Sequence, residues 1–512
     1  MFPGLNKGLG IRPEHAIAVT LIVLSVALSL WIDSEVIARR YIELTLPDGI
    51  RSSVAVYTPQ GGPIGGALLL HGFSGSKENL ALLASSLARA GYVVFVPDWR
   101  GHGATGGTLD EQTATILTDV RTYSDALRSA YNLSFTLIGG HSMGGGFSQI
   151  AASEFHPRYL VLMCSGSMPS TLGPLLAGGT ETLLVAASLD TVVSPESIIA
   201  SASQTANISV APGTTYHFSG GGSIRVELID NYDHLIVLYG EPLSSEVLSF
   251  VGSDASPPFL EVIASKIIAA ILFVIGMIIA IPGSGTAAPS TRSQKQSAAS
   301  VWLRVIALYG CAGLLLPVCS AIALFIPGVG TSSFFIGFFL SIATVTALAA
   351  RLRAVPISVR LVKLDLRSMG FGAVWGLVYV VGSHLIVGSD LIRLLPSSYA
   401  LVALVVAAPV AAAFTFLESH VLDMTEGKMP RWVVGMGTKV VSLAFSLALI
   451  FLLSSSMAGF YLIFAYSALV MLLPLYVAES RFTQRSDLGR SASVAMFVVA
   501  LSLLAAASGA RI

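Results

Sequence analysis

Charged side chains and cysteines are both scarce in this 512-residue chain. Only 11% of its residues are charged, whereas a soluble globular domain carries roughly 25%. This shortage excludes a protein that is soluble throughout. The 29 basic and 29 acidic residues give a formal net charge of zero, which provides no sign of a nucleic-acid-binding surface.

Cysteine occurs three times, at Cys164, Cys311 and Cys319. Cys164 stands alone before residue 255, so that part of the chain cannot form an internal disulfide. Cys311 and Cys319 lie in an apolar stretch and are expected to pack as small hydrophobic residues. No group of cysteines and histidines has metal-ligand spacing, and no metal or other cofactor is predicted.

Long apolar segments are abundant, and most of them follow residue 255. Hydrophobic residues make up 54% of the chain, and the mean hydropathy is +0.77. Each segment approaches the ~20 residues that cross about 30 Å of hydrocarbon. Nine are predicted to span a membrane. Two of them, at 333–350 and 371–388, are short or rich in glycine. The nine segments are approximately 15–32, 260–281, 303–326, 333–350, 371–388, 398–417, 434–453, 457–477 and 492–509.

The first apolar segment raises the alternative of a cleaved signal peptide. The Ala-x-Ala-like cleavage site expected after such a run is missing, which favours a retained anchor. The predicted organisation is therefore an N-terminal segment and anchor over 1–34, a soluble domain over 40–252, and a multi-pass membrane domain of about eight helices over 259–512.

Basic residues in the short loops predict the orientation, because loops rich in Lys and Arg stay cytoplasmic. With the N-terminus inside, the short outer loops hold only Arg393 and Arg511. The soluble domain is then extracytoplasmic, where two Asn-x-Ser sequons at Asn132 and Asn207 would be usable. The inner loops hold fifteen basic residues: Lys7, Arg12, Arg292, Lys295, Arg304, Arg351, Arg353, Arg360, Lys363, Arg367, Lys428, Arg431, Arg481, Arg485 and Arg490.

The soluble domain alternates predicted strands and helices, which indicates a mostly parallel, doubly wound α/β sheet. Strands are predicted at Tyr41–Leu46, Ser53–Tyr57, Gly66–Leu70, Tyr92–Val96, Phe135–Ile138, Tyr159–Met163 and Thr182–Ala186, with a β-rich stretch over Tyr216–Ile229. Helices are predicted at Lys77–Ala90, Glu111–Tyr131, Met143–Phe155, Ser194–Ser203 and Glu241–Val251.

One short motif in this domain carries reactive chemistry. A brief apolar run ends at residues 140–144, which read Gly-His-Ser-Met-Gly. Gly-x-Ser-x-Gly is the pattern of a nucleophile elbow, where a strand turns sharply into a helix and holds the serine in a strained conformation. Five residues of pattern also occur by chance, so the assignment of Ser142 depends on its neighbours and partners.

Two further motifs precede the elbow in a familiar order. Residues 71–75 read His-Gly-Phe-Ser-Gly, and residues 98–103 read Asp-Trp-Arg-Gly-His-Gly. Together with the elbow they make residues 40–252 resemble the α/β-hydrolase superfamily, in its monoglyceride-lipase and S33 serine-aminopeptidase branch. The resemblance implies a doubly wound fold and a serine hydrolase, but this fold hosts many substrates. The membrane part resembles no family that we identify.

The resemblance also implies a catalytic triad in the chain order Ser, Asp or Glu, His. Ser142 is then the nucleophile, and Asp190, just past the strand at 182–186, is the acid. His234, after the last strand-like run, is the base. His217 is the other downstream histidine, and Asp230 and Asp233 are alternative acids that come late for this order.

Backbone N–H groups of Phe73 and Met143 are expected to form the oxyanion hole. His71, His102 and His141 are expected to be structural, with His71 bracing the oxyanion loop and His141 packed beneath the elbow. Asp98 is expected to hold the turn at residue 100.

The cap region is small, and ionisable residues occur within the apolar segments. Only about twenty residues separate the strands at 159–163 and 182–186, which leaves the site open unless the membrane part or the bilayer covers it. Lys266, His384 and Lys439 lie inside predicted spans, with Glu261 near an edge, and such residues are costly in lipid. Snorkelling and interfacial positions are the simpler alternatives.

These observations favour a membrane-bound serine hydrolase that cleaves an ester, or a thioester, of a lipid or lipid-linked substrate. A peptidase acting on short peptides is the second possibility. A third is a transporter or scaffold with a regulatory hydrolase-like domain. The predicted partners are a lipid or other apolar acyl substrate and the membrane lipids, with no nucleic acid, and the oligomeric state is not predicted.

Overall fold

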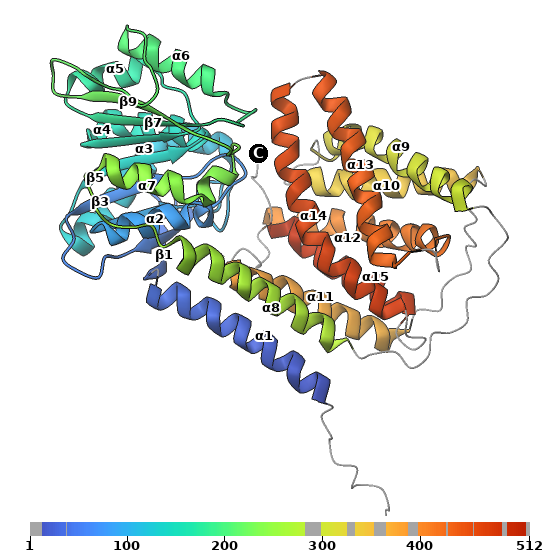
Figure 1. The fold of residues 1–512 in the computed structure, drawn as a ribbon. Helices are drawn as coiled ribbons and strands as arrows, with labels where there is room; N and C mark the ends of the chain where they lie inside the picture. Colours follow the sequence, from blue (N-terminus) through green and yellow to red (C-terminus); the bar gives the residue numbers. More distant parts are fainter. Residues whose placement is uncertain are drawn as a thin grey trace, which may run out of the picture.

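The computed structural model describes residues 13–36, 38–281, 298–324, 333–352, 365–387, 398–425, 429–453, 455–483 and 489–507. Two architectures follow one another along these residues (Figure 1). Residues 39–250 form a β-sheet with helices packed on both faces. Most of the described residues before and after this domain are helical.

The sheet holds nine strands among the described residues, and their bounds lie close to the predicted ones. They are β1 (Arg39–Thr45), β2 (Arg51–Tyr57), β3 (Gly65–Leu70), β4 (Tyr92–Pro97), β5 (Phe135–His141), β6 (Tyr159–Met163), β7 (Glu181–Ala187), β8 (Thr215–His217) and β9 (Ser223–Ile229). The helices are α2 (Ala81–Arg89), α3 (Leu109–Tyr131), α4 (Met143–Phe155), α5 (Pro169–Ala177), α6 (Pro195–Ala206) and α7 (Glu241–Phe250), with the short turns η2 (Lys77–Leu80) and η3 (Ile236–Tyr239).

The strand order is β1-β2-β4-β3-β5-β6-β7-β9-β8, and the central pairings from β4 to β9 are parallel. The pairs β1–β2, β2–β4 and β8–β9 are antiparallel. This mostly parallel sheet confirms the predicted α/β-hydrolase fold. Gly140 of β5 pairs with Leu70 of β3 and with Leu162 of β6, so these three strands end at one edge. Loops after parallel strands meet at that edge, where the predicted site residues lie.

Two apolar clusters cover the two faces of the sheet. One contains buried side chains of α3, α4, α5 and α6, and the other contains those of α2 and α7. Every residue of β3 and β4 is buried, because both faces of these strands are covered. Local signals agree with the fold: Thr108 and Glu111 form a reciprocal capping box at the start of α3.

Nine helices of the described residues correspond to the nine predicted spans. They are α1 (Pro13–Trp31), α8 (Ser265–Ala280, preceded by the turn Leu260–Ala264), α9 (Ala298–Leu324), α10 (Ser333–Arg351), α11 (Leu366–Val387), α12 (Ser398–Asp423), α13 (Arg431–Leu453), α14 (Ser455–Thr483) and α15 (Gly489–Ala507). In the described part of the chain, the first seven of these are long and apolar enough to cross a membrane. The count of nine spans stays a prediction.

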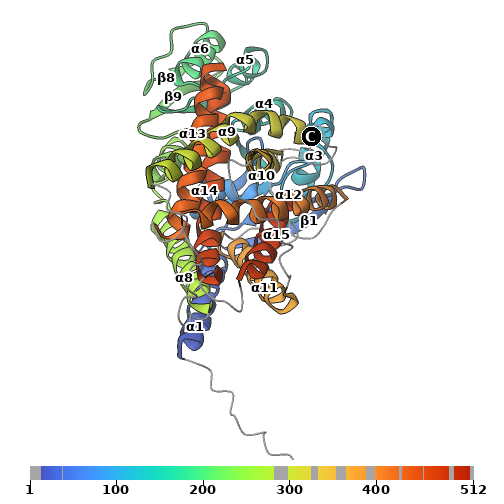
Figure 2. The same ribbon diagram turned by 90° about the vertical axis from the view of Figure 1, so that its right-hand side faces the viewer.

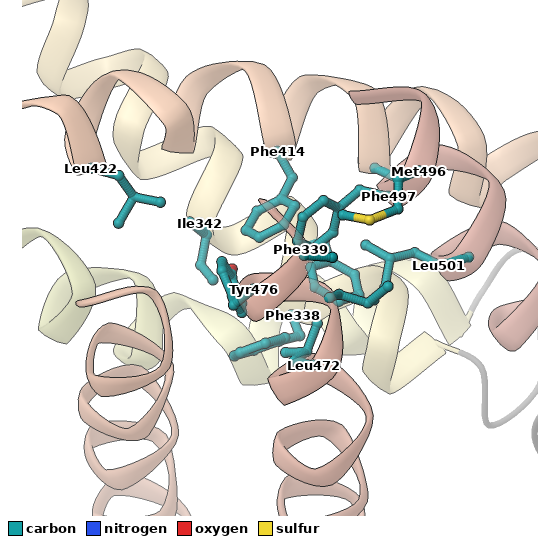
Figure 3. Packing of buried hydrophobic residues seen from close by; sticks show 14 of the residues in the cluster. Phe338, Phe339, Ile342, Phe414, Leu422, Leu472, Tyr476, Met496, Phe497 and Leu501 are labelled. Atoms are coloured by element: carbon teal, nitrogen blue, oxygen red, sulfur yellow. The ribbon is translucent and has the colours of Figure 1, made fainter. Parts of the chain in front are cut away.

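Most of the basic inner loops lie outside the described residues, including 282–297, 353–364 and 484–488. The orientation that the basic residues of these loops indicate therefore stays a prediction. The helices themselves share one apolar core (Figure 3). Phe339 of α10 and Phe414 of α12 pack at 4.8 Å between ring centroids, and Phe497 of α15 lies 5.4 Å from Tyr476 of α14.

The hydrolase domain adjoins the ends of α1 and α8, which run side by side (Figures 1 and 2). Ile32 and Val262, at those ends, are buried in the same cluster as α2 and α7. The Asp33 carboxylate pairs with Arg39 of β1 and with Lys266 of α8, each at 2.8 Å. Lys266 is thus engaged in an ion pair at the junction between the two parts.

Lys439, another ionisable residue within a predicted span, is fully buried on α13. Its ammonium group pairs with the Glu418 carboxylate of α12. The hydroxyl groups of Tyr309 and Tyr476 donate to the same carboxylate at 2.8 and 2.6 Å. The pair is therefore compensated and joins α9, α12, α13 and α14.

Candidate active site

The elbow places Ser142 between β5 and α4, in a backbone conformation that few non-glycine residues adopt. Its φ is 55° and its ψ is −120°. A Cβ at Gly140 would overlap the carbonyl group of Gly144, and a Cβ at Gly144 would overlap the carbonyl oxygen of Leu70. Both glycines of the motif are therefore required for strand and helix to approach so closely.

Ser142, His234 and Asp190 form a continuous chain of hydrogen bonds. His234 Nε2 lies 2.9 Å from Ser142 Oγ, and His234 Nδ1 lies 2.7 Å from Asp190 Oδ2. Asp190 and His234 are buried, at 3% and 5% exposure, while Ser142 is half-buried. A buried carboxylate behind a histidine, which in turn faces a serine hydroxyl, is the arrangement that activates serine for nucleophilic attack.

Asp190, the predicted acid, is held by hydrogen bonds within its own loop. Asp190 Oδ1 accepts hydrogen bonds from the backbone N–H groups of Val192 and Val193, at 2.8 and 2.9 Å. This leaves Oδ2 for His234. The loop follows β7, and the loop of His234 follows the neighbouring parallel strand β9, so both emerge at the same edge of the sheet.

The predicted oxyanion loop lies against the nucleophile. A Cβ at Gly72 would lie 3.1 Å from Cβ of Ser142, so only glycine leaves room for the serine. Phe73 is the next residue. Met143 is the first residue of α4, and the N–H groups of a first helical turn have no partner within the helix. Of the two predicted donors, Phe73 therefore follows a glycine that packs against Ser142, and Met143 follows Ser142 itself.

His71 fixes the orientation of the peptide group between Gly72 and Phe73. Its Nε2 accepts from the backbone N–H of Trp99 at 3.1 Å, and its Nδ1 lies 2.8 Å from the Gly72 carbonyl oxygen. Burial lowers the pKa of His71, so the ring is neutral, and the proton resides on Nδ1 because a carbonyl oxygen only accepts. In a trans peptide, N–H and C=O point in opposite directions, so this bond also orients the N–H of Phe73.

Asp98 is structural, as its position in the turn suggested. Its carboxylate accepts from Lys77 Nζ at 2.6 Å, from Lys77 N at 2.8 Å and from Ala104 N at 2.8 Å. Lys77 and Asp98 are fully buried. This ion pair ties the oxyanion loop to the turn at 98–104. Sequence reasoning missed it, because a lysine in the first turn of an amphipathic helix is ordinarily solvent-exposed.

The alternative candidates for the triad lie away from the triad loops or shape a turn. His217 pairs with Ser223 at the amino end of β9, whereas the triad loops follow the carboxyl ends of the strands. Asp233 Oδ1 accepts from Leu235 N and Ile236 N and so shapes the turn after His234. Asp230 is exposed beside that turn.

Possible metal-ligand atoms of His141, Cys164 and His234 lie within 4.8 Å of one another, and all three residues are buried. Both nitrogens of His234 are already engaged with Ser142 and Asp190. A metal ion would have to displace one of these bonds. Burial and the nearby Asp190 also raise the pKa of the Cys164 thiol, which disfavours the thiolate that binds metals. The cluster is therefore a poor metal site.

The region between β6 and β7 forms the short helix α5 instead of a separate lid. Leu172, Leu175 and Leu176 are buried in the cluster that covers α4 and α6. The side chain of Gln149 on α4 donates to Gly166 O at 3.1 Å and accepts from Met168 N at 2.6 Å. These bonds hold the segment before α5 beside the first turns of α4, after Ser142.

The hydrolase domain is similar in sequence to one known protein family and to lipases. Residues 63–174 match the model of the serine aminopeptidase S33 family. A monoacylglycerol lipase of Mycolicibacterium smegmatis is 28% identical over 120 residues, which are 23% of this chain and 43% of that protein. A lipase 3 of Moraxella sp. (strain TA144) is 37% identical over 90 residues, or 17% of this chain and 27% of that protein. The chain thus spans less than half the length of these relatives.

Solved structures of similar proteins cover the hydrolase part. A CIB-like hydrolase from Thermoplasma acidophilum has 19% identity and a TM-score of 0.34, covering 42% of this chain and 98% of that chain. An esterase of Pyrococcus furiosus has 17% identity and a TM-score of 0.33, with 42% and 93% covered. The resemblance to the S33 branch of the α/β-hydrolase superfamily is confirmed by the sequence family match and the lipase relatives.

Proposed function

Because the hydrolase domain is similar to the S33 branch, we propose that the chain is a membrane-bound serine hydrolase that cleaves an ester of a lipid or lipid-linked substrate, or a thioester. The hydrogen-bond chain from Ser142 through His234 to Asp190 carries this proposal. Ser142 is the nucleophile, His234 the general base and Asp190 the acid. The N–H groups of Phe73 and Met143 form the oxyanion hole.

Acylation begins when Ser142 Oγ attacks the carbonyl carbon of the ester. His234 Nε2 accepts the serine proton, and Asp190 stabilises the resulting imidazolium. The carbonyl oxygen gains negative charge, which the N–H groups of Phe73 and Met143 stabilise. When the tetrahedral intermediate collapses, His234 gives the proton to the leaving alkoxide, and the acyl group stays on Ser142.

Deacylation repeats these steps with water. His234 removes a proton from the water molecule, whose oxygen attacks the acyl carbon. The second tetrahedral intermediate uses the same oxyanion hole. Ser142 leaves with the proton from His234, and the free acid is released. No metal or cofactor takes part in the proposed reaction.

The lipid nature of the substrate is supported by three observations. Two of the relatives reported above are named as lipases, one of them as a monoacylglycerol lipase. The domain also lies between apolar helices at both of its ends, α1 and α8. Leu189 and Ile236, next to Asp190 and near His234, are 58% and 40% exposed and give the loops of the site an apolar rim. Such a rim suits an acyl chain or the bilayer surface.

A hydrolysis assay tests the substrate class. The purified full chain in detergent is expected to release fatty acid from a monoacylglycerol and to act far more slowly on an aminoacyl amide. Ser142→Ala is the control and is expected to abolish both activities. The family description of a serine aminopeptidase supports the rival, a peptidase on short peptides. Preferential cleavage of the amide would favour that rival and refute the lipid-ester proposal.

We further propose that the N-terminus is cytoplasmic and that the hydrolase domain is extracytoplasmic. The support is the excess of basic residues in the predicted inner loops. Added protease is expected to digest the hydrolase domain in sealed right-side-out vesicles. Protection of the domain until detergent is added would contradict this orientation.

A further inference from the structure

His141 connects the strand of the proposed nucleophile to the loop of the proposed base. It is the last residue of β5, directly before Ser142, and is 4% exposed. Its Nε2 lies 2.7 Å from the main-chain carbonyl oxygen of His234, 93 residues away in the sequence. The two imidazole rings lie 4.7 Å apart between centroids and are tilted by 50°.

The direction of this hydrogen bond is fixed by chemistry. A carbonyl oxygen only accepts, so Nε2 of His141 carries the proton and donates it. Burial, followed by the neighbouring His234, lowers the pKa of His141 to about 3, so the ring stays neutral and Nδ1 carries no proton. His141 is therefore a donor to His234 throughout the ordinary pH range.

The same ring also contacts the oxyanion loop. A Cβ at Gly72 would lie 2.8 Å from Nδ1 of His141, so the ring packs directly against the Gly72 backbone. One side chain thus touches the oxyanion loop and the loop of the base, and its backbone continues into the nucleophile. Three parts of the site that come from distant segments of the chain meet at His141.

Other bonds hold the His234 loop on either side of the base. Tyr232 O accepts from Leu189 N at 2.9 Å, and Asp233 Oδ1 accepts from Leu235 N and Ile236 N. The His141 bond acts on the carbonyl group of His234 itself. It therefore constrains the backbone from which the catalytic ring extends.

We propose that His141 is a positioning residue: its Nε2–H holds the His234 main chain where the His234 ring reaches both Ser142 and Asp190. The inference rests on the function proposed above. Without this bond the His234 backbone can shift, and a displacement of about 1 Å in a catalytic group can cost roughly 10²-fold in rate. Substrate affinity should not depend on it, because His141 is buried beneath the site.

Three variants of the full chain in detergent separate the hydrogen bond from packing. His141→Met keeps much of the bulk and removes the donor. His141→Gln keeps an N–H donor of similar reach, and His141→Asn keeps a donor that is one methylene shorter. We expect kcat on a p-nitrophenyl ester to fall roughly 10- to 100-fold for Met and Asn, with KM within about twofold of wild type. The Gln variant should stay within about fivefold of wild type.

Equal losses in all three variants would overturn the proposal, because packing alone would explain them. Unchanged kcat in His141→Met, or a change in KM alone, would overturn it as well. If the Met variant does not fold, the comparison of Gln with Asn decides by the same criteria. If the wild type has no Ser142-dependent turnover, the proposed function itself fails. If the wild type is active and all three variants lose kcat equally, only the positioning role of His141 is contradicted.

Discussion

At the scale of single residues, the two oxygens of Asp190 have different partners. Oδ1 accepts the N–H groups of Val192 and Val193, and Oδ2 accepts from His234 Nδ1. Three hydrogen bonds to one carboxylate hold it in one position. The carboxylate can therefore hold the His234 tautomer whose Nε2 is free to take the serine proton.

Asp190→Asn should lower kcat by about 10⁴-fold while the fold is retained, because an amide that donates to Nδ1 favours the wrong histidine tautomer. Ester hydrolysis by the full chain measures the loss, and thermal unfolding serves as the control. Asp233→Asn, whose carboxylate shapes the following turn, is the matched variant and should lose far less. A similar loss in both variants would argue against Asp190 as the acid.

The lowered pKa of His141 also predicts how the stability of the protein depends on pH. Its pKa falls from 6.5 to about 3 on folding, so the unfolded state binds a proton more readily. The stability that the neutral ring contributes is complete above about pH 6.5 and is lost as the pH falls toward 3, by up to about 1.4 kcal/mol per pH unit. The melting temperature of wild type should therefore drop more steeply between pH 7 and 5 than that of His141→Gln. Parallel curves would contradict the buried, neutral state of His141.

At the scale of secondary-structure elements, the turn between β5 and α4 leaves no room for side chains at two of its glycines. A side chain at Gly144 would overlap the end of β3, since its Cβ meets the Leu70 carbonyl oxygen. Gly146, two residues further along α4, has no atom within 4 Å of an added Cβ. Gly144 and Gly146 are thus a matched pair in one helix, because an added Cβ overlaps other atoms at Gly144 and meets open space at Gly146.

Gly144→Ala should destabilise the hydrolase domain and abolish esterase activity, because strand and helix must move apart. Gly146→Ala should keep activity and raise stability by roughly 0.5–1 kcal/mol, the usual advantage of alanine over glycine within a helix. Thermal unfolding and ester hydrolysis measure both effects. Full activity in Gly144→Ala would show that the elbow is not as tightly closed as described.

Most elements of the hydrolase domain could be predicted from the sequence, because strands and helices alternate and carry strong local signals. The bounds of α4 and β6 match the prediction residue for residue, whereas β5 continues three residues further, to His141. The helix α5 was not predicted, since its residues are rich in Gly, Pro and Ser. The bonds from His141 to His234 and from Lys77 to Asp98 join distant segments, and no local pattern indicates them.

At the scale of the whole molecule, ion pairs join helices to one another and to the hydrolase domain. Asp33 links α1 and α8 to the first strand of the hydrolase domain through Lys266 and Arg39. Deeper among the helices, Lys439 and Glu418 join α13 to α12. Buried ionised groups among apolar helices are costly unless they are paired, so each partner depends on the other.

Lys439→Met should destabilise the helical part by about 3–5 kcal/mol, because it leaves the Glu418 carboxylate buried without its cation. The double variant Lys439→Met/Glu418→Gln should recover much of this loss. Thermal unfolding in detergent completes the double-mutant cycle. Additive losses in the double variant would mean that the two residues do not stabilise each other.

The central claim is that Ser142 is a nucleophile activated by His234 and Asp190. Labelling of the purified full chain with a fluorophosphonate probe tests it most directly, since the probe reacts with activated serines. We predict one label per chain, found on the peptide that contains Ser142, absent in Ser142→Ala and strongly slowed in His234→Ala. Undiminished labelling of Ser142→Ala, or a label on another serine, would contradict the account.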